Sequence, residues 1–199
     1  FGTLILAPHL AQLTRKHPHL SIDLLALPRM LHLSRREADI VISLERPTRG
    51  SVIVSRLSDY SLYLYGQREY LARKPLVATR EDLRHHAFVS YVDDLLFTKE
   101  LQFLDALHQP ERFAFRSTSI TAQYEAVRAG AGLAVLPAFL ADRDPVLTRV
   151  LPQEGQFTRT FWMSMPSESK HLARMQVTWA FLRETVAAQQ ELLKPKAVR

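Results

Sequence analysis

The sequence has 199 residues, of which 47% are hydrophobic, with 26 Lys and Arg, 20 Asp and Glu, and no cysteine. The apolar content is enough for the core of a globular protein. The lack of cysteine excludes disulfides, thiolate metal sites and cysteine nucleophiles. No apolar run is long enough for a membrane helix, so no membrane partner is expected. The formal net charge of +6 comes from scattered basic residues, which favours a solvated surface over a dedicated polyanion-binding face.

Helical and strand-like patterns alternate along the chain, which predicts an α/β fold with largely parallel strands. A first helix carries Leu6, Leu10 and Leu13 on one face and ends near residues 17–18. The later predicted elements are strand 20–27, helix 31–36, strands 39–42, 52–57 and 61–65, helical turn 80–83, strand 87–91, helix 99–107, strand 112–116, helix 120–130, strands 133–136, 147–151 and 159–165, and a closing helix with Met175, Trp179, Leu182 and Val186 on its apolar face.

The segment 120–137 carries the most information. Ile120, Tyr124 and Val127 recur at helical spacing and form one apolar face, with Gln123 expected on the opposite, polar side. Gly130 is a suitable left-handed stop for this helix. The apolar run that follows, ending at a proline, predicts a short strand that is buried on both faces.

Three hydroxyl residues, Ser117, Thr118 and Ser119, stand where this helix is expected to begin. The unpaired N–H groups of a helix start carry partial positive charge, so a small anion such as a carboxylate would be stabilised there. The alternative is that Thr118 or Ser119 only caps the helix. Both interpretations stay open at the level of sequence.

Patterns typical of enzymes and metal sites are missing from the sequence. Gly130 and Gly132 precede a strand and do not open a helix, so they do not form a dinucleotide-binding loop. No two histidines stand four residues apart, and the adjacent Asp93 and Asp94 point in opposite directions on an extended chain. We therefore expect no catalytic residues, no cofactor and no metal.

Short motifs in a fixed order resemble the effector-binding domain of LysR-type transcriptional regulators over nearly the whole chain. The resemblance implies a type 2 periplasmic-binding-protein-like fold, with two Rossmann-like lobes joined by two crossing segments near 64–66 and 136–140. Together with a shift in composition after residue 66, it predicts lobe I at 1–66 plus 138–199 and lobe II at 67–137. The motifs are Leu6-Ala7-Pro8, His17-Pro18, Glu37-Ala38-Asp39-Ile40-Val41-Ile42, Leu62-Tyr63-Leu64, Glu69-Tyr70-Leu71, Glu81-Asp82-Leu83 with His85, and Val127 to Pro137.

The resemblance also implies a small-molecule effector, often a carboxylate, bound between the lobes where helix N-termini and strand ends meet. Thr3 could instead lie in a frayed chain end, and Tyr91 could be a core residue. The residues expected to contact the effector are Gly2, Thr3, Ala26, Leu27, Pro28, Tyr91, Val92, Thr118, Ser119 and Ile120, with Ser43 as a weaker candidate.

An intact regulator of this kind begins with a winged helix-turn-helix, which is absent from this fragment, so DNA binding is expected only through that missing N-terminal domain. The resemblance further implies a cytoplasmic homodimer or homotetramer, with contacts from the helix at 6–13 and the strand at 20–25. Two rival functions are a periplasmic solute-binding protein of the same fold and a small two-lobed enzyme such as a dehydratase or deaminase.

Overall fold

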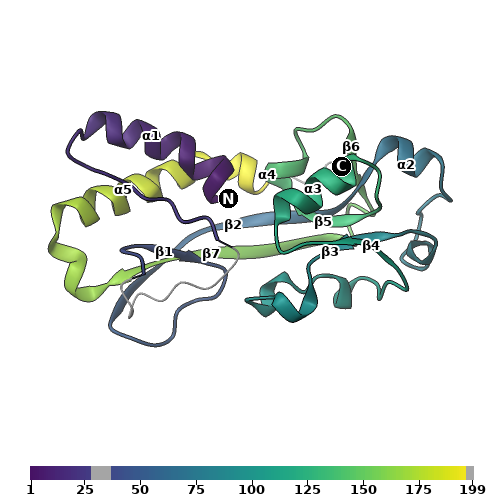
Figure 1. Ribbon diagram of the computed structural model, residues 1–199, viewed down its shortest axis with the longest axis horizontal. Coiled ribbons are helices and arrows are strands. Elements are labelled where there is room, and N and C mark those ends of the chain that lie inside the picture. The colour runs from purple at the N-terminus through teal and green to yellow at the C-terminus, as the bar shows by residue number, and fades with distance from the viewer. Residues whose placement is uncertain (28–36, 196–199) are drawn as a thin grey trace. The chain divides into compact units, whose positions relative to one another are not determined.

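The computed structural model describes residues 1–27 and 37–195, so Pro28 and the predicted helix 31–36 lie outside the described residues. The chain divides into two compact units. Unit 1 comprises Phe1–Ser58 and Thr160–Gln190, and unit 2 comprises Asp59–Arg159 and the chain from Glu191. Figure 1 traces the elements of both. The predicted lobe ranges, 1–66 with 138–199 and 67–137, stay a prediction.

Unit 1 contains two helices and a pair of strands. A π-helical turn, Gly2–Leu6, leads into α1 (Ala7–Lys16), and α1 contacts α5 (Ala173–Ala188). Strand β1 (Val41–Ser43) pairs antiparallel with β7 (Gln156–Pro166). Most of the apolar-face residues predicted for the two helices are buried, namely Leu10 and Leu13 on α1, and Met175, Leu182 and Val186 on α5. The predicted Trp179 is only half-buried, and Thr185, which the pattern does not predict, is buried as well.

Two long strands, β2 (Val52–Gln67) and β7, each contribute residues to both units. The five-stranded sheet has the order β1-β7-β2-β5, and β6 also pairs with β2. Within unit 2, β5 (Ala134–Pro137) and β6 (Leu147–Val150) both run antiparallel to β2.

A second, parallel pair in unit 2 joins β3 (Phe88–Ser90) and β4 (Phe113–Arg116). Helix α3 (Ile120–Arg128) packs against β3, β4 and β5. The short helices α2 (Arg68–Ala72), α4 (Ala138–Ala141) and α6 (Gln190–Leu193) complete the α-helices of the described chain. A core cluster of buried side chains, which includes Val127 of α3, comprises Tyr63, Tyr65, Val89, Val127, Ala134, Leu136, Ala138, Ala141 and Leu147.

Several predicted elements are confirmed, including α1, β3, α3, β5 and α5. Gly130 has a φ of 80° and its N–H donates to Val127 O at 2.9 Å, so it ends α3 as predicted. All four residues of β5 are buried, which confirms the strand predicted from the apolar run that ends at Pro137.

Other predicted elements are wrong. Residues 20–27 form no strand, because the segment makes no ladder of strand hydrogen bonds with any described residue, and three of its leucines are exposed. Residues 99–107 form two separate 3₁₀ turns in place of one helix. Leu101 and Phe103 are both buried although they are two positions apart, a spacing that one helix face cannot satisfy.

The expectation of largely parallel strands is also wrong for the main sheet, because β1 with β7, and β5 and β6 with β2, are antiparallel. Parallel pairing is found for β3 with β4, and at the isolated bridge between Phe88 and Leu133.

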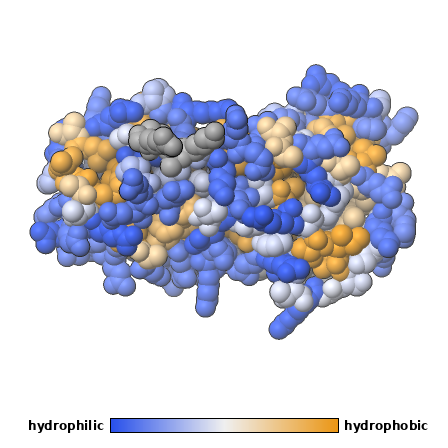
Figure 2. All heavy atoms as spheres, turned by 180° about the vertical axis from the view of Figure 1, so that it is seen from behind, coloured by the Kyte–Doolittle hydropathy of each residue, from blue (hydrophilic) through white to orange (hydrophobic). Residues whose placement is uncertain are grey.

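The face drawn in Figure 2 is mostly hydrophilic, and its hydrophobic residues gather in separate patches. Of the helices that the structure describes, none combines the length and the apolar character needed to cross a bilayer.

Candidate functional site

Ser119 caps α3. Its Oγ accepts a hydrogen bond from the Ala122 N–H at 3.3 Å, and its carbonyl accepts one from the Gln123 N–H at 3.1 Å. Ser117 supports this turn, because its Oγ accepts from the Ser119 N–H at 3.1 Å. Ser119, and not Thr118, is therefore the N-cap residue of α3, while anion binding at this helix start stays a prediction.

The cap leaves two donors of α3 available. Among the described residues, the N–H groups of Ile120 and Thr121 have no hydrogen-bond acceptor. The first turn contains no acidic residue that would balance the positive end of the helix dipole. The N-terminus of α3 therefore keeps two donors and a partial positive charge with which an anion can interact.

The buried side chain of Gln123 ties α3 to the turn that precedes it. Its side chain is only 1% exposed, and its Nε2 donates to Ser117 O at 2.8 Å. The periodicity had placed Gln123 on the polar side of α3, which is wrong. The amide can be buried because the turn before the helix supplies its acceptor.

The parallel pair β3 and β4 brings two predicted site segments together. Ser90 is in register with Arg116, and the Ser117 N–H donates to Ser90 O at 3.0 Å. Residues 91–92 and 118–120 therefore follow neighbouring strands at the same carboxyl edge, the position at which α/β sheets commonly bind ligands. Ligand binding by Tyr91, Val92, Thr118, Ser119 and Ile120 stays a prediction.

Two predicted site residues of unit 1 also lie together. A Cβ built on Gly2 would be 3.8 Å from Ala26 Cβ. Thr3 belongs to the hydrogen-bonded π-helical turn, in which the Ile5 N–H donates to Phe1 O at 2.8 Å, so Thr3 lies in an ordered turn and not in a frayed end.

The other two described candidates of unit 1 are Leu27 and Ser43. Leu27 is 49% exposed. Ser43 ends β1, and its Oγ donates to Glu45 O at 2.7 Å. Pro28 lies outside the described residues. The roles of all these residues stay predictions.

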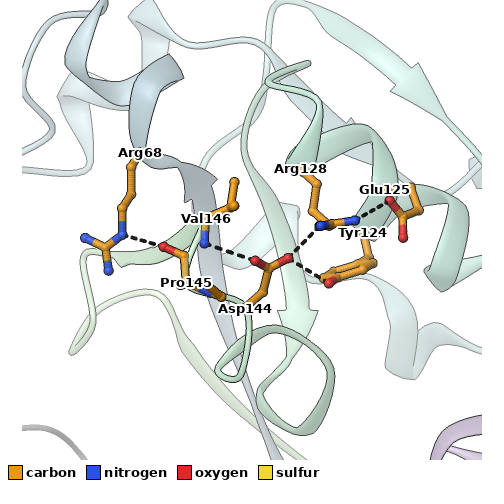
Figure 3. Close-up of polar contacts among 7 residues, drawn as sticks. All are labelled: Arg68, Tyr124, Glu125, Arg128, Asp144, Pro145 and Val146. Atoms are coloured by element: carbon orange, nitrogen blue, oxygen red, sulfur yellow. Dashed lines mark hydrogen bonds and ion pairs between the residues drawn. The ribbon is translucent and has the colours of Figure 1, made fainter.

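A buried carboxylate, Asp144, anchors the side of α3 (Figure 3). The Tyr124 hydroxyl donates to Asp144 Oδ2 at 2.7 Å, and Arg128 Nε lies 2.6 Å from the same oxygen. The other carboxylate oxygen accepts from the Val146 N–H at 3.0 Å. The Asp144 side chain is only 7% exposed, and these donors replace the water that it loses.

The surroundings shift two pKa values in this cluster. Burial raises the pKa of Asp144, but the bonds from Tyr124 and Val146 and the Arg128 charge outweigh burial and hold that pKa below its ordinary value. Burial, and then the hydrogen bond to Asp144, raise the pKa of Tyr124 to about 12. The ionised acid and the neutral phenol are therefore the stable forms at neutral pH.

Two further contacts extend the cluster on either side, as Figure 3 shows. Arg128 also lies 3.0 Å from Glu125 Oε2, and Arg68 Nε donates to Pro145 O at 2.9 Å. The Asp144 loop is thus held to α3 on one side and to the start of α2 on the other.

A second carboxylate in the same loop, Asp142, accepts hydrogen bonds from two side chains of the sheet. It accepts from the Tyr65 hydroxyl at 2.7 Å and from Arg149 Nε at 2.9 Å. The Arg149 guanidinium lies 3.6 Å from the ring centroid of Tyr63. Asp142 and Asp144 therefore connect the loop after α4 to β2, β6 and α3. Sequence reasoning missed both, because their partners lie in distant segments of the chain.

Across residues 1–27 and 37–195, no three His, Asp or Glu side chains come together as a metal site.

Comparisons with known proteins agree on one family. Residues 1–187 match the family model described as LysR substrate binding domain. A "Mau operon transcriptional activator" of Paracoccus denitrificans is 31% identical over 136 residues, which are 68% of this chain and 44% of that protein. An "Uncharacterized HTH-type transcriptional regulator" of Haemophilus influenzae is 24% identical over 164 residues, which are 78% of this chain and 56% of that protein. The chain thus spans about half the length of these two relatives.

Solved structures show the same fold. The regulatory domain of CrgA, a LysR-type transcriptional regulator from Neisseria meningitidis, superposes with a TM-score of 0.78 at 21% identity, covering 93% of each chain. The effector domain of AmpR of Pseudomonas aeruginosa gives a TM-score of 0.72 at 18% identity, covering 96% of this chain and 93% of that one. The predicted α/β, type 2 periplasmic-binding-protein-like fold is confirmed. With 187 of its residues matched, the chain belongs to the LysR substrate-binding domain family.

Proposed function

We propose that this chain is the effector-sensing part of a LysR-type transcriptional regulator, and that it binds a small carboxylate at the N-terminus of α3. The observation that carries the proposal is the pair of N–H groups of Ile120 and Thr121, which have no acceptor among the described residues and lie at the carboxyl edge of β3 and β4. A carboxylate at such a position gains roughly 0.3–1 kcal/mol from the helix dipole when exposed, and more when partly buried.

Three further features support this assignment. Ser117 and Ser119 give the turn a fixed shape before any ligand arrives, so binding need not order it. Thr118 is half-buried beside them. Tyr91 and Val92 follow the neighbouring strand and belong to the same proposed site. The proposed contacts from unit 1 are Gly2, Thr3, Ala26, Leu27, Pro28 and Ser43.

In the proposed mechanism, the effector shifts a conformational equilibrium by its different affinity for two arrangements of the domain. The change passes to the rest of a cytoplasmic regulator through contacts within a homodimer or homotetramer. DNA is contacted by a part of the regulator outside these 199 residues. The domain binds its effector without turnover.

A charge placed at the helix cap tests the site. Aspartate caps helices as well as serine does, so Ser119→Asp should leave the free energy of unfolding within about 0.5 kcal/mol of the original value. The new carboxylate would repel an acidic effector, and we expect the Kd to rise about tenfold or more. Thermal-shift screening with benzoate, succinate and related acids finds a ligand, and calorimetry then gives the Kd for each variant.

Two comparison variants make the result specific. Gln153→Glu adds the same charge at an exposed position in the loop between β6 and β7, and it should leave the Kd unchanged. Thr118→Val with Ser119→Ala should weaken binding while the domain still melts as one cooperative unit. An unchanged Kd in Ser119→Asp would place the carboxylate elsewhere.

A further inference from the structure

Unit 2 contains a cavity of about 280 Å³ that lies apart from the N-terminus of α3. Its lining residues include the aromatic Tyr91, Phe103 and Phe113, the polar Ser90, and the acidic Asp93 and Asp105. The lining comes from one continuous part of the chain, the strands β3 and β4 and the 3₁₀ turns between them.

The cavity and α3 lie on opposite faces of β3. Val89 belongs to the buried group that includes Val127 of α3. Because side chains alternate along a strand, Ser90 points to the other face, where it lines the cavity. Figure 1 shows α3 above β3 and β4, and the turns that enclose the cavity below them. A molecule in the cavity would therefore not occupy the anion site of α3.

Two of the lining rings are held in place before any ligand binds. Phe103 is 4% exposed and packs against Phe157 with ring centroids 5.4 Å apart. The Arg116 guanidinium lies 4.6 Å from the ring centroid of Phe113, on which it stacks. Aromatic walls fixed in this way suit a flat apolar molecule, because little side-chain freedom is lost when it binds.

The charge of the lining is negative. It includes two aspartates and no Lys, Arg or His. Asp93 pairs with Arg116 only at 3.6 Å, and both side chains are exposed. Asp105 is exposed and forms no ion pair with any residue that the structure describes. Arg116 offsets part of the Asp93 charge. Arg159, whose guanidinium lies 5.1 Å from the ring centroid of Phe103, is paired with Glu100. Asp105 leaves the rim with a net negative charge, which favours an ammonium group over a carboxylate.

We propose that this cavity binds a small aromatic amine, with its ring against Tyr91, Phe103 and Phe113 and its ammonium group near Asp93 and Asp105. The volume lies just below the range usual for drug-sized ligands, which limits the ligand to about one ring with a short side chain. This second ligand site shares Tyr91 with the proposed carboxylate site, but the rest of its lining is separate from the N-terminus of α3.

The test compares two probes of similar shape and opposite charge, 2-phenylethylamine and 3-phenylpropionate, by amide NMR of the labelled protein. The amine should saturably shift the resonances of Phe103, Asp105 and Phe113, which line the cavity and do not belong to the proposed carboxylate site. At equal concentration, the acid should shift these resonances at least about fivefold less than the amine does. The aspartates attract the ammonium group and repel the carboxylate, although each exposed charge contributes only a small energy.

Exposed substitutions complete the test without disturbing the fold. Asp93→Asn with Asp105→Asn should weaken binding of the amine about 3- to 10-fold. Asp94→Asn, an exposed neighbour outside the lining, should leave it unchanged, and so should Ser119→Asp. The proposal is overturned if the amine shifts other resonances only, if the acid shifts Phe103 and Phe113 as strongly as the amine does, or if the double variant binds like the original.

Discussion

Replacing Gly132 with alanine is expected to lower the free energy of unfolding by about 3–5 kcal/mol, because a Cβ at this position has no room. It would overlap the Ala87 carbonyl oxygen and lie 2.7 Å from the Ala87 carbonyl carbon. The same carbonyl accepts the Leu133 N–H at 2.9 Å, and Leu133 O accepts the Val89 N–H at 2.8 Å. Relief of the clash would therefore have to break the connection between β3 and the chain leading into β5.

Substitution of a second glycine, Gly50, serves as a control that measures the backbone strain without the clash. Gly50 also has a positive φ, 89°, but a Cβ there would meet only Val52 Cγ1 at 3.9 Å. Gly50→Ala should therefore cost only the strain of about 1–2 kcal/mol. Urea unfolding followed by circular dichroism measures both variants. Equal losses for the two would mean that the approach of Gly132 to Ala87 is unimportant.

Asp144→Ala is expected to cost about 2–4 kcal/mol at neutral pH. The substitution removes the acceptor of the Tyr124 hydroxyl and of the Val146 N–H, and it leaves Arg128 without its more buried partner. Glu125→Ala is the matched control, because Glu125 pairs with the same arginine but is 57% exposed. Exposed pairs contribute little, so that variant should stay within about 0.5 kcal/mol of the original.

The loss in Asp144→Ala should depend on pH. The pKa of Asp144 is lower in the folded protein than in the unfolded chain, so its contribution is present above the unfolded value of about 4 and is lost as the pH falls through the folded value. Urea unfolding at pH 7 and at successively lower pH should show the two proteins converging below about pH 4. A difference that stays constant into acid would contradict the assignment of the ionised carboxylate as the anchor.

Local patterns predict much of this fold. The helix and strand at 120–137 are specified by periodicity, Gly130 and Pro137, all within a few residues of one another. Longer-range effects escape such patterns. The sequence predicts two strands at 52–57 and 61–65, yet β2 is continuous from Val52 to Gln67. Ser58 is buried in it, and its Oγ accepts from Gln190 Nε2 at 3.0 Å, a partner that no local pattern reveals.

In the candidate site, too, local sequence predicts some features, whereas others depend on residues that are distant in the chain. The capping serine could be predicted, because a helix start has a sequence signature. The burial of Gln123 could not, since it depends on the acceptor at Ser117 O. Asp142 and Asp144 appear in sequence as ordinary loop acids, and only the folded chain brings them to Tyr65, Tyr124, Arg128 and Arg149.

The central claim is that a carboxylate binds the N-terminus of α3. The most direct test titrates the isotopically labelled protein with an acid that thermal-shift screening finds to bind. The amide resonances of Ile120 and Thr121 should move saturably, with the Kd that calorimetry gives. Saturable binding that leaves both amides unmoved, while resonances elsewhere shift, would contradict the account.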